Sequence, residues 1–280
     1  MDSQQWEQWK AAKDKRLRQS GEVMYLLDGN GVPLMEVDGA SDVSAPREDG
    51  VESSLQVTVP IDKALCLTHP LLEELVADNL GQQESSGALK TVGNKSRFIF
   101  FERAGGIRSV YRITHTVAKY DNDIITEIEV NGVDSISILS RLPAFSVRLS
   151  IDGKWNRLAN DYAVQFERQR WIQTFQMAKV ADGYTKTGAA ADIITDIIQQ
   201  SLSALHKAFG IHEDDAPYIV RRLDRTYSPE ASITLADESI LDTIKKAADS
   251  AGVGLTSTII FPGEEHNIVS PTIVFQVTQR

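Results

Sequence analysis

Apolar and polar residues alternate along much of the first half of the chain, which is the period expected of β-strands. In residues 23–37, two apolar runs flank the turn Asp-Gly-Asn-Gly at 28–31, and this pattern predicts a β-hairpin. The other alternating runs lie at 55–59, 98–102, 109–120 and 124–130. Pro60 is expected to end the first of these, and 38–50 reads as a polar loop. The runs together predict an antiparallel meander of the kind found in barrels and sandwiches.

Apolar residues spaced three and four apart predict helices in five places. These are 3–19, 70–81, 133–142, 188–210 and 237–252. Thr187 is the expected N-cap of the fourth helix and Asp237 that of the fifth, while Gly210 and Gly252 are expected to end them. On the fourth helix the inward positions are expected to be Ile194, Ile198, Leu202, Leu205 and Phe209.

The segment 126–142 carries the sharpest change of pattern. Ile128 and Val130 alternate with glutamates, which indicates a strand with one wet face. Asn131-Gly132 then predicts a tight turn into the helix at 133–142. We expect this unit to act as a hinge between the strands before it and the following domain.

The whole chain is therefore expected to have an α+β fold. A basic helical arm at 1–20 precedes an antiparallel β-barrel-like domain at 21–152 and a connecting segment at 153–183. Within it, 155–178 fits both strand and helix spacing. The last part, 184–280, is expected to be a small two-helix α+β domain with strands at 232–236, 253–261 and 272–277.

The composition of the chain excludes several classes of binding surface and structural feature. The chain has 280 residues, 42% of them hydrophobic and 24% charged, and a net charge of -10, which argues against a general phosphate-binding surface. Its one cysteine, Cys66, excludes an intrachain disulfide. No apolar run reaches the roughly 20 residues of a membrane helix, and the first residues lack the apolar core of a signal peptide. We therefore expect a soluble chain without a leader.

Catalytic and metal-binding motifs each lack a required group. The sequence has no Gly-x-Ser-x-Gly elbow, and His212 begins a zinc-protease-like run in which Ala216 stands at the second ligand position. The turn at 28–31 resembles the start of a calcium loop, but Val32 and Pro33 favour a plain hairpin. Cys66 and His69 are too few ligands for a structural zinc site, and Pro70 favours His69 as a helix-start residue. We therefore expect no catalytic residue, metal or cofactor.

The remaining histidines are interpreted as structural. His115 shares its expected strand face with apolar residues, which favours a packed or half-buried position. His266 follows Glu264 and Glu265, a group that could hold a cation but is more typical of a polar turn.

Two groups of residues are candidates for an interface. The basic helix at 3–19 places Trp6 and Trp9 on one side, which favours docking on its own domain or on a neighbour over membrane or nucleic-acid binding. Near the C-terminus, the candidates are Arg221, Arg222 and Arg225, beside Tyr218 and Tyr227. Asp224 and Glu230 interrupt this cluster, so a subunit interface is favoured over a nucleic-acid patch.

The order of the segments resembles the tail-hub proteins of long-tailed phages that infect actinobacteria, which are minor tail proteins of the Gp37-like class. The resemblance runs from about Val23 to the end, through the hairpin, SSLQVTVP at 53–60, FIFFER at 98–103, VYRITH at 110–115, TEIEVNGVDSISILSRL at 126–142, YTKTGAAADIITDIIQQSL at 184–202 and SITLADESILDTIKKAADSAGVGLTSTI at 232–259. Each motif alone is a common pattern of strands, turns and helices. The resemblance rests on the order in which the motifs follow one another.

The resemblance implies a non-enzymatic, structural part of a virion tail tip, synthesised in the host cytoplasm. Its fold would be that of a baseplate hub, forming a homotrimeric ring that continues the tail tube. The implied partners are further copies of the chain, the distal tail protein, the tape-measure protein and other tail-tip or receptor-binding proteins, with DNA passing through without specific binding. The alternatives are a tail-tip protein that binds or degrades host cell-wall polysaccharide, and an unrelated α+β binding module.

Overall fold

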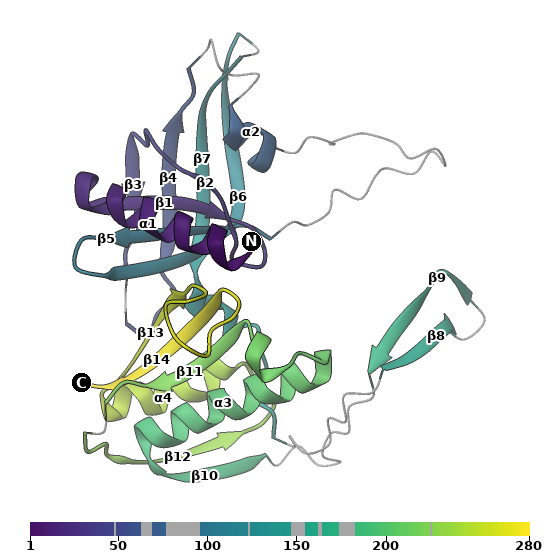
Figure 1. Ribbon diagram of the computed structural model, residues 1–280. Helices are drawn as coiled ribbons and strands as arrows, with labels where there is room; N and C mark the ends of the chain where they lie inside the picture. The colour runs from purple at the N-terminus through teal and green to yellow at the C-terminus, as the bar shows by residue number, and fades with distance from the viewer. Residues whose placement is uncertain are drawn as a thin grey trace. The chain divides into compact units, whose positions relative to one another are not determined.

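The computed structural model describes residues 1–47, 49–62, 69–76, 96–122, 124–146, 155–161, 164–173, 183–224 and 226–280 (Figure 1). It is a mixed α+β fold with mostly antiparallel sheets, and four α-helices lie within the described residues. The chain divides into a first unit, Met1–Ser135, and a second unit, Ile136–Arg280. The predictions for Cys66, for Arg225, for the end of the helix at 77–81 and for 174–178 lie outside the described residues.

The first unit is built on one seven-stranded antiparallel sheet. Its strands are β1 (Glu22–Leu27), β2 (Pro33–Glu36), β3 (Asp42–Ser44), β4 (Ser54–Pro60), β5 (Phe98–Arg103), β6 (Ile107–Asp121) and β7 (Ile124–Asp134). They are hydrogen-bonded in the order β2-β1-β5-β6-β7-β4-β3, which confirms the predicted hairpin and meander. The barrel-like prediction is not confirmed, because β2 and β3 are left as open edges among the described strands. Strand β3 lies inside the segment predicted to be a polar loop.

Strands β1 and β5 are buried on both faces, which explains their unbroken apolar runs. One face joins the main core, where Leu26, Ile99 and Val57 are at most 1% exposed. The other face carries Tyr25, whose ring lies 5.4 Å from that of Trp9 on helix α1 (Ser3–Ser20). The short helix α2 (Pro70–Leu75), which His69 caps as predicted, adds Leu71 to the core.

Helix α1 confirms the helix predicted at 3–19. Asp2 and Gln5 form a reciprocal capping box at its start, and Gly21 ends it in the left-handed conformation. Trp6 is 5% exposed, and Lys13 donates a hydrogen bond of 2.5 Å to the carboxylate of Glu102 on β5. The helix therefore docks on the sheet of its own unit, as Figure 1 also shows.

The turn and helix predicted at 131–142 are wrong. Strand β7 continues through Gly132 to Asp134 without a positive φ angle at Asn131 or Gly132, and a short 3-10 turn at Ser135–Ile138 follows in place of an α-helix. A Cβ atom at Gly132 would lie 2.9 Å from the Arg112 carbonyl oxygen on β6. Gly132 is needed because two strands approach each other closely at this position. A glycine in the sequence fits such a close approach as well as it fits a turn.

The packed position predicted for His115 is also wrong, because its side chain is exposed. The register of β6 against β7 shifts between Ile113 and His115. Such a bulge inserts an extra residue and reverses which side chains face the core. A prediction from simple alternation ignores the bulge, so it places His115 on the core face although its side chain lies on the exposed face.

Among the described residues, the second unit holds three small sheets, and helices pack on two of them. Strands β10 (Tyr184–Ala189) and β12 (Glu230–Leu235) form an antiparallel pair, while β14 (Thr272–Gln279) lies between β11 (Tyr218–Arg222) and β13 (Val253–Ile260). Strand β11 is parallel to β14, and β13 is antiparallel to it. Helices α3 (Ala190–Phe209) and α4 (Ile240–Ala251) pack on these sheets and on each other, which confirms both predicted helices.

Both predicted N-caps in this unit are wrong. Thr187 lies within β10, and the N–H of Ala191 donates instead to the Ser228 hydroxyl at 3.0 Å. Ser239 caps α4, whereas Asp237 has a positive φ of 62° and accepts a hydrogen bond from the Ser146 N–H at 2.8 Å.

The inward face of α3 is predicted correctly in its first part only. Ile194, Ile198 and Leu202 are at most 1% exposed, whereas Phe209 is 60% exposed. The core side of the helix is broader than predicted and includes Ile193, Ile197, Ala204 and Ala208.

The ambiguous segment at 155–178 is β-structure where it is described. Strands β8 (Trp155–Asp161) and β9 (Val164–Gln173) form an antiparallel hairpin that is a separate two-stranded sheet.

His206 on α3 gives the second unit an expected pH dependence. Its Nε2 atom is buried and has no hydrogen-bond partner among the described residues, and burial lowers the pKa of His206 from 6.5. The unfolded chain then binds this proton more readily than the folded chain. Above pH 6.5, His206 is therefore expected to cause no loss in the free energy of unfolding. Below pH 6.5, this free energy is expected to fall as the pH drops toward the lowered pKa.

The variant His206→Gln is expected to flatten this fall, measured by urea denaturation from about pH 8 to about pH 5. His212→Gln is the matched control, because the His212 side chain is 81% exposed, and it should retain the wild-type fall. Wild-type pH dependence in His206→Gln would contradict this prediction.

Candidate functional site

The predicted arginine cluster does not form one patch of unpaired cations. Arg221 and Arg222 are neighbours on β11 and bind different partners. The guanidinium of Arg221 makes two hydrogen bonds, 2.9 and 2.6 Å long, to the Glu265 carboxylate. This pairing raises the pKa of Arg221 and lowers that of Glu265. Both predicted arginines that the structure describes are therefore involved in ion pairs within their own unit.

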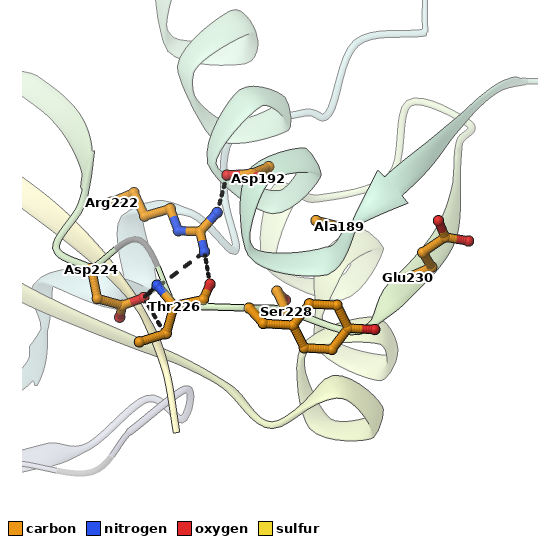
Figure 2. Close-up of a pocket in the computed structure, with 8 residues that line it drawn as sticks. Ala189, Asp192, Arg222, Asp224, Thr226, Ser228 and Glu230 are labelled. Carbon is orange, nitrogen blue, oxygen red and sulfur yellow. Dashed lines mark hydrogen bonds and ion pairs between the residues drawn. The ribbon is translucent and has the colours of Figure 1, made fainter.

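Arg222 lies in a polar pocket of about 740 Å³ at the start of α3 (Figure 2). The pocket is lined by Ala189, Asp192, Arg222, Asp224, Thr226, Tyr227, Ser228 and Glu230. Its walls come from the end of β10, the first turn of α3, and the chain between β11 and β12. Of the lining residues, the sequence predicts Arg222 as an interface residue beside Tyr227, and it places Asp224 and Glu230 in the same cluster as interrupting charges.

The charge of Arg222 is compensated inside the pocket. Its Nη1 group donates to the Asp192 carboxylate, and its Nη2 group donates to the Thr226 carbonyl oxygen at 2.7 Å. Nη2 also lies 3.9 Å from the Asp224 carboxylate (Figure 2). Among the described lining residues, no positive charge is therefore left unpaired for an anion, and Arg222 links the first turn of α3 to the following loop.

Asp224 holds the other side of this loop. Its carboxylate accepts hydrogen bonds of 2.8 Å from the Thr226 hydroxyl and from the Gln279 N–H on β14. These hydrogen bonds lower the pKa of Asp224, because they favour its charged form. Asp224 and Thr226 are spaced as in a local Asx turn, and that spacing was the one sequence signal for this role.

The loop also closes the start of α3. The Pro229 carbonyl oxygen accepts a hydrogen bond from the Ala190 N–H at 2.8 Å, beside the Ser228 contact already described. Two of the N–H groups that every helix leaves unpaired at its start are thereby satisfied by a distant segment. Tyr227, which lines the pocket, is 84% exposed, and Leu223, close by in the sequence, is 53% exposed. An exposed aromatic ring beside paired charges is typical of a protein-protein contact.

Three acidic residues near the candidate metal sites, Asp28, Glu264 and Glu265, bind other groups of the chain. The Asp28 carboxylate accepts hydrogen bonds of 2.8 Å from the Asn30 and Val32 N–H groups, which is a hairpin turn. Glu264 accepts a hydrogen bond from the Phe261 N–H, and Glu265 pairs with Arg221. Within the described part of the chain, no group of three His, Cys, Asp or Glu side chains could hold a metal ion.

The two tryptophans of α1, Trp6 and Trp9, make aromatic contacts within the first unit. Their rings meet edge to face at 5.6 Å, and Trp9 continues the stack onto Tyr25. A contact of Trp6 and Trp9 with a neighbouring subunit stays a prediction. None of the helices in the described ranges has the length and apolarity needed to cross a membrane.

Comparison with known proteins gives no family assignment. No protein-family model matches the chain, and no curated protein matches it. Among solved structures, the chain is similar to the tail protein from Neisseria meningitidis MC58, with 10% identity, a TM-score of 0.38, and coverage of 91% of this chain and 50% of that protein.

It is also similar to the E. coli c3393 protein, a component of the type VI secretion system described as structurally similar to the T4 bacteriophage tail proteins gp27 and gp5. The identity is 10%, the TM-score is 0.30, and the match covers 91% of this chain and 45% of that one. The chain thus spans about half the length of each. Similarity at this level does not assign a function.

Proposed function

We propose that this chain is a structural subunit of a phage tail tip, of the baseplate-hub type. Three copies form a ring that continues the tail tube and contacts the distal tail protein, the tape-measure protein and other tail-tip or receptor-binding proteins. The chain acts by assembly and carries out no catalysis. It resides in the virion tail tip after synthesis in the host cytoplasm.

The observation that carries this proposal is the order of elements along the chain. A hairpin of β1 and β2, strand β4 and the meander β5-β6-β7 precede a unit in which α3 follows Gly188-Ala189 and α4 ends at Ala251-Gly252. This order is most of the one on which the resemblance to tail-hub proteins rests. That order also includes a helix at 133–142, where the structure has the end of β7 and a short 3-10 turn. The edge strands are consistent with assembly: among the described strands, β2 and β3 are the outer strands of the sheet in the first unit, and β11 and β13 are those of the three-stranded sheet in the second. Neighbouring subunits would cover such edges in a ring.

The net charge of -10 suits a passage for DNA. Acidic side chains that line the ring would repel the phosphate backbone and let it slide without binding. A ring whose lumen is lined by lysine and arginine, with the carboxylates outside, would contradict this part of the proposal.

The purified full chain tests the proposal directly. Light scattering is expected to give three times the 31.0 kDa mass of one chain, and electron microscopy is expected to show rings. Antibody labelling of virions should mark the tail tip. A chain that stays monomeric at high concentration and is absent from virions would contradict the proposal.

The same preparation tests the rival function. Binding or cleavage of host cell-wall polysaccharide by the isolated chain would favour a wall-active tail-tip protein over a hub. A monomer without either property would favour an unrelated α+β binding module.

A further inference from the structure

The hairpin of β8 and β9 lacks a core of its own. None of its described side chains is buried, and Leu158 and Phe166 are the two that are partly covered. Trp155, Trp171 and Ile172 are 40%, 62% and 42% exposed. A two-stranded hairpin is at best marginally stable in water and requires a third strand or a packed face. The exposed aromatic rings therefore indicate a surface that something else covers.

The hairpin has a small net positive charge, whereas the chain is acidic. Its described residues include Arg157, Arg168 and Arg170 against Asp161 and Glu167, a net charge of +1 in a chain with a net charge of -10. None of the three forms an ion pair with a carboxylate in the described part of the chain. Two of them lie over aromatic rings, Arg157 at 6.0 Å from the centre of the Trp171 ring and Arg170 at 4.3 Å from that of Phe166. Their positive charges therefore remain available to a partner.

An acidic surface with matching features lies directly after α3. Glu213, Asp214 and Asp215 form an exposed 3-10 turn, and within the described residues none of them pairs with a lysine or arginine. Phe209, at the end of α3, is 60% exposed. Within one chain, the Trp155 ring lies 5.8 Å from the Phe209 ring, so this end of the helix accepts an aromatic side chain of a hairpin.

We propose that the β8–β9 hairpin of one copy docks on the end of α3 and the Glu213–Asp215 turn of a second copy. Arginines of the hairpin face the carboxylates of the turn, while Trp171 and Ile172 become buried beside Phe209. The contact joins two different surfaces, so repeating it closes a ring when the rotation between copies permits. It does not require a tail function, because it involves only two copies of the chain.

Two charge-reversed variants of the full chain test this contact. The first, the hairpin variant, carries Arg168→Glu and Arg170→Glu, and the second, the turn variant, carries Glu213→Lys, Asp214→Lys and Asp215→Lys. Each alone is expected to weaken self-association by about 100-fold or more, because like charges then face each other. Sedimentation at low salt measures the change, and added salt should weaken wild-type association as well.

Mixing the two variants distinguishes contact between copies from docking within one chain. In the mixture, the hairpin of each variant meets an oppositely charged turn on the other variant, so pairwise association between the two variants is expected to return. Lys245→Glu with Lys246→Glu is the matched control, since both lysines are exposed on α4, away from both surfaces, and it should associate as the wild type does. Thermal unfolding monitors the folding of each variant.

Three results would overturn the contact. These are a monomeric wild-type chain, unchanged association of either variant, and recovery in a single chain carrying both sets of substitutions without recovery in the mixture. Assembly of the hairpin variant into normal rings at the tail tip would overturn this contact and leave the proposed function standing.

Discussion

Replacing Glu102 with alanine is expected to lower the free energy of unfolding of the first unit by about 3–5 kcal/mol. The Glu102 carboxylate is buried and accepts a hydrogen bond from Lys13 at 2.5 Å and one from Arg108 at 3.0 Å. Without it, Lys13, which is 1% exposed, retains Asp14, at 2.8 Å, as its one carboxylate partner among the described residues. A poorly compensated charge then stays buried between α1 and β5, where desolvation is costly.

Urea denaturation followed by tryptophan fluorescence measures this loss, because Trp6 and Trp9 lie on the helix that the ion pair holds. Glu127→Ala is the matched control. It breaks the ion pair of Glu127 with Lys119, whose side chain is 56% exposed, and should have little effect. The double variant Lys13→Met, Glu102→Leu is expected to recover part of the loss, since it leaves no buried lysine. A Glu102→Ala variant as stable as the control would contradict this account of α1 docking.

Gly132→Ala is expected to destabilise the first unit by about 1–3 kcal/mol. The added Cβ would lie 2.9 Å from the Arg112 carbonyl oxygen, and this oxygen belongs to the backbone of the adjacent strand. A side chain could rotate away, whereas β6 can move only by disturbing its hydrogen bonds to β7. The neighbouring substitution Asn131→Ala serves as the control, since it removes a half-buried side chain without adding an atom to the contact between strands. Equal stability of the two variants would show that the strands separate without cost.

The sequence predicts elements well where the signal is local. Some features are determined by residues within a few positions of them. These are the apolar run at 98–102, the hairpin turn at Asp28 and the glycines that end α1, α3 and α4. The strand and helix patterns therefore locate most of the fold. The Asn131-Gly132 pair shows the limit of this reasoning, because a turn and a close approach of two strands demand the same residue.

The features that the sequence does not predict depend on residues that are distant along the chain. Ser228 satisfies the start of α3 from 37 residues away, and no local pattern contains that contact. The short strand β3 exists because β4 pairs with it, and the phase of β6 changes at a bulge that alternation cannot show. The site follows the same rule. Arg222 could be singled out from sequence, but Asp192, its partner from 30 residues away, could not.

The position of β14 sets an order for folding. It is the central strand of its sheet, and both β11 and β13 hydrogen-bond to it rather than to each other. During synthesis, β11 emerges from the ribosome well before Thr272–Gln279, so it must wait without a neighbour on that side. The sheet can close only when these late residues are free. Until then the edge of β11 and the part of α3 that packs on β14 are exposed, and chaperone binding to this half of the nascent chain would span that interval.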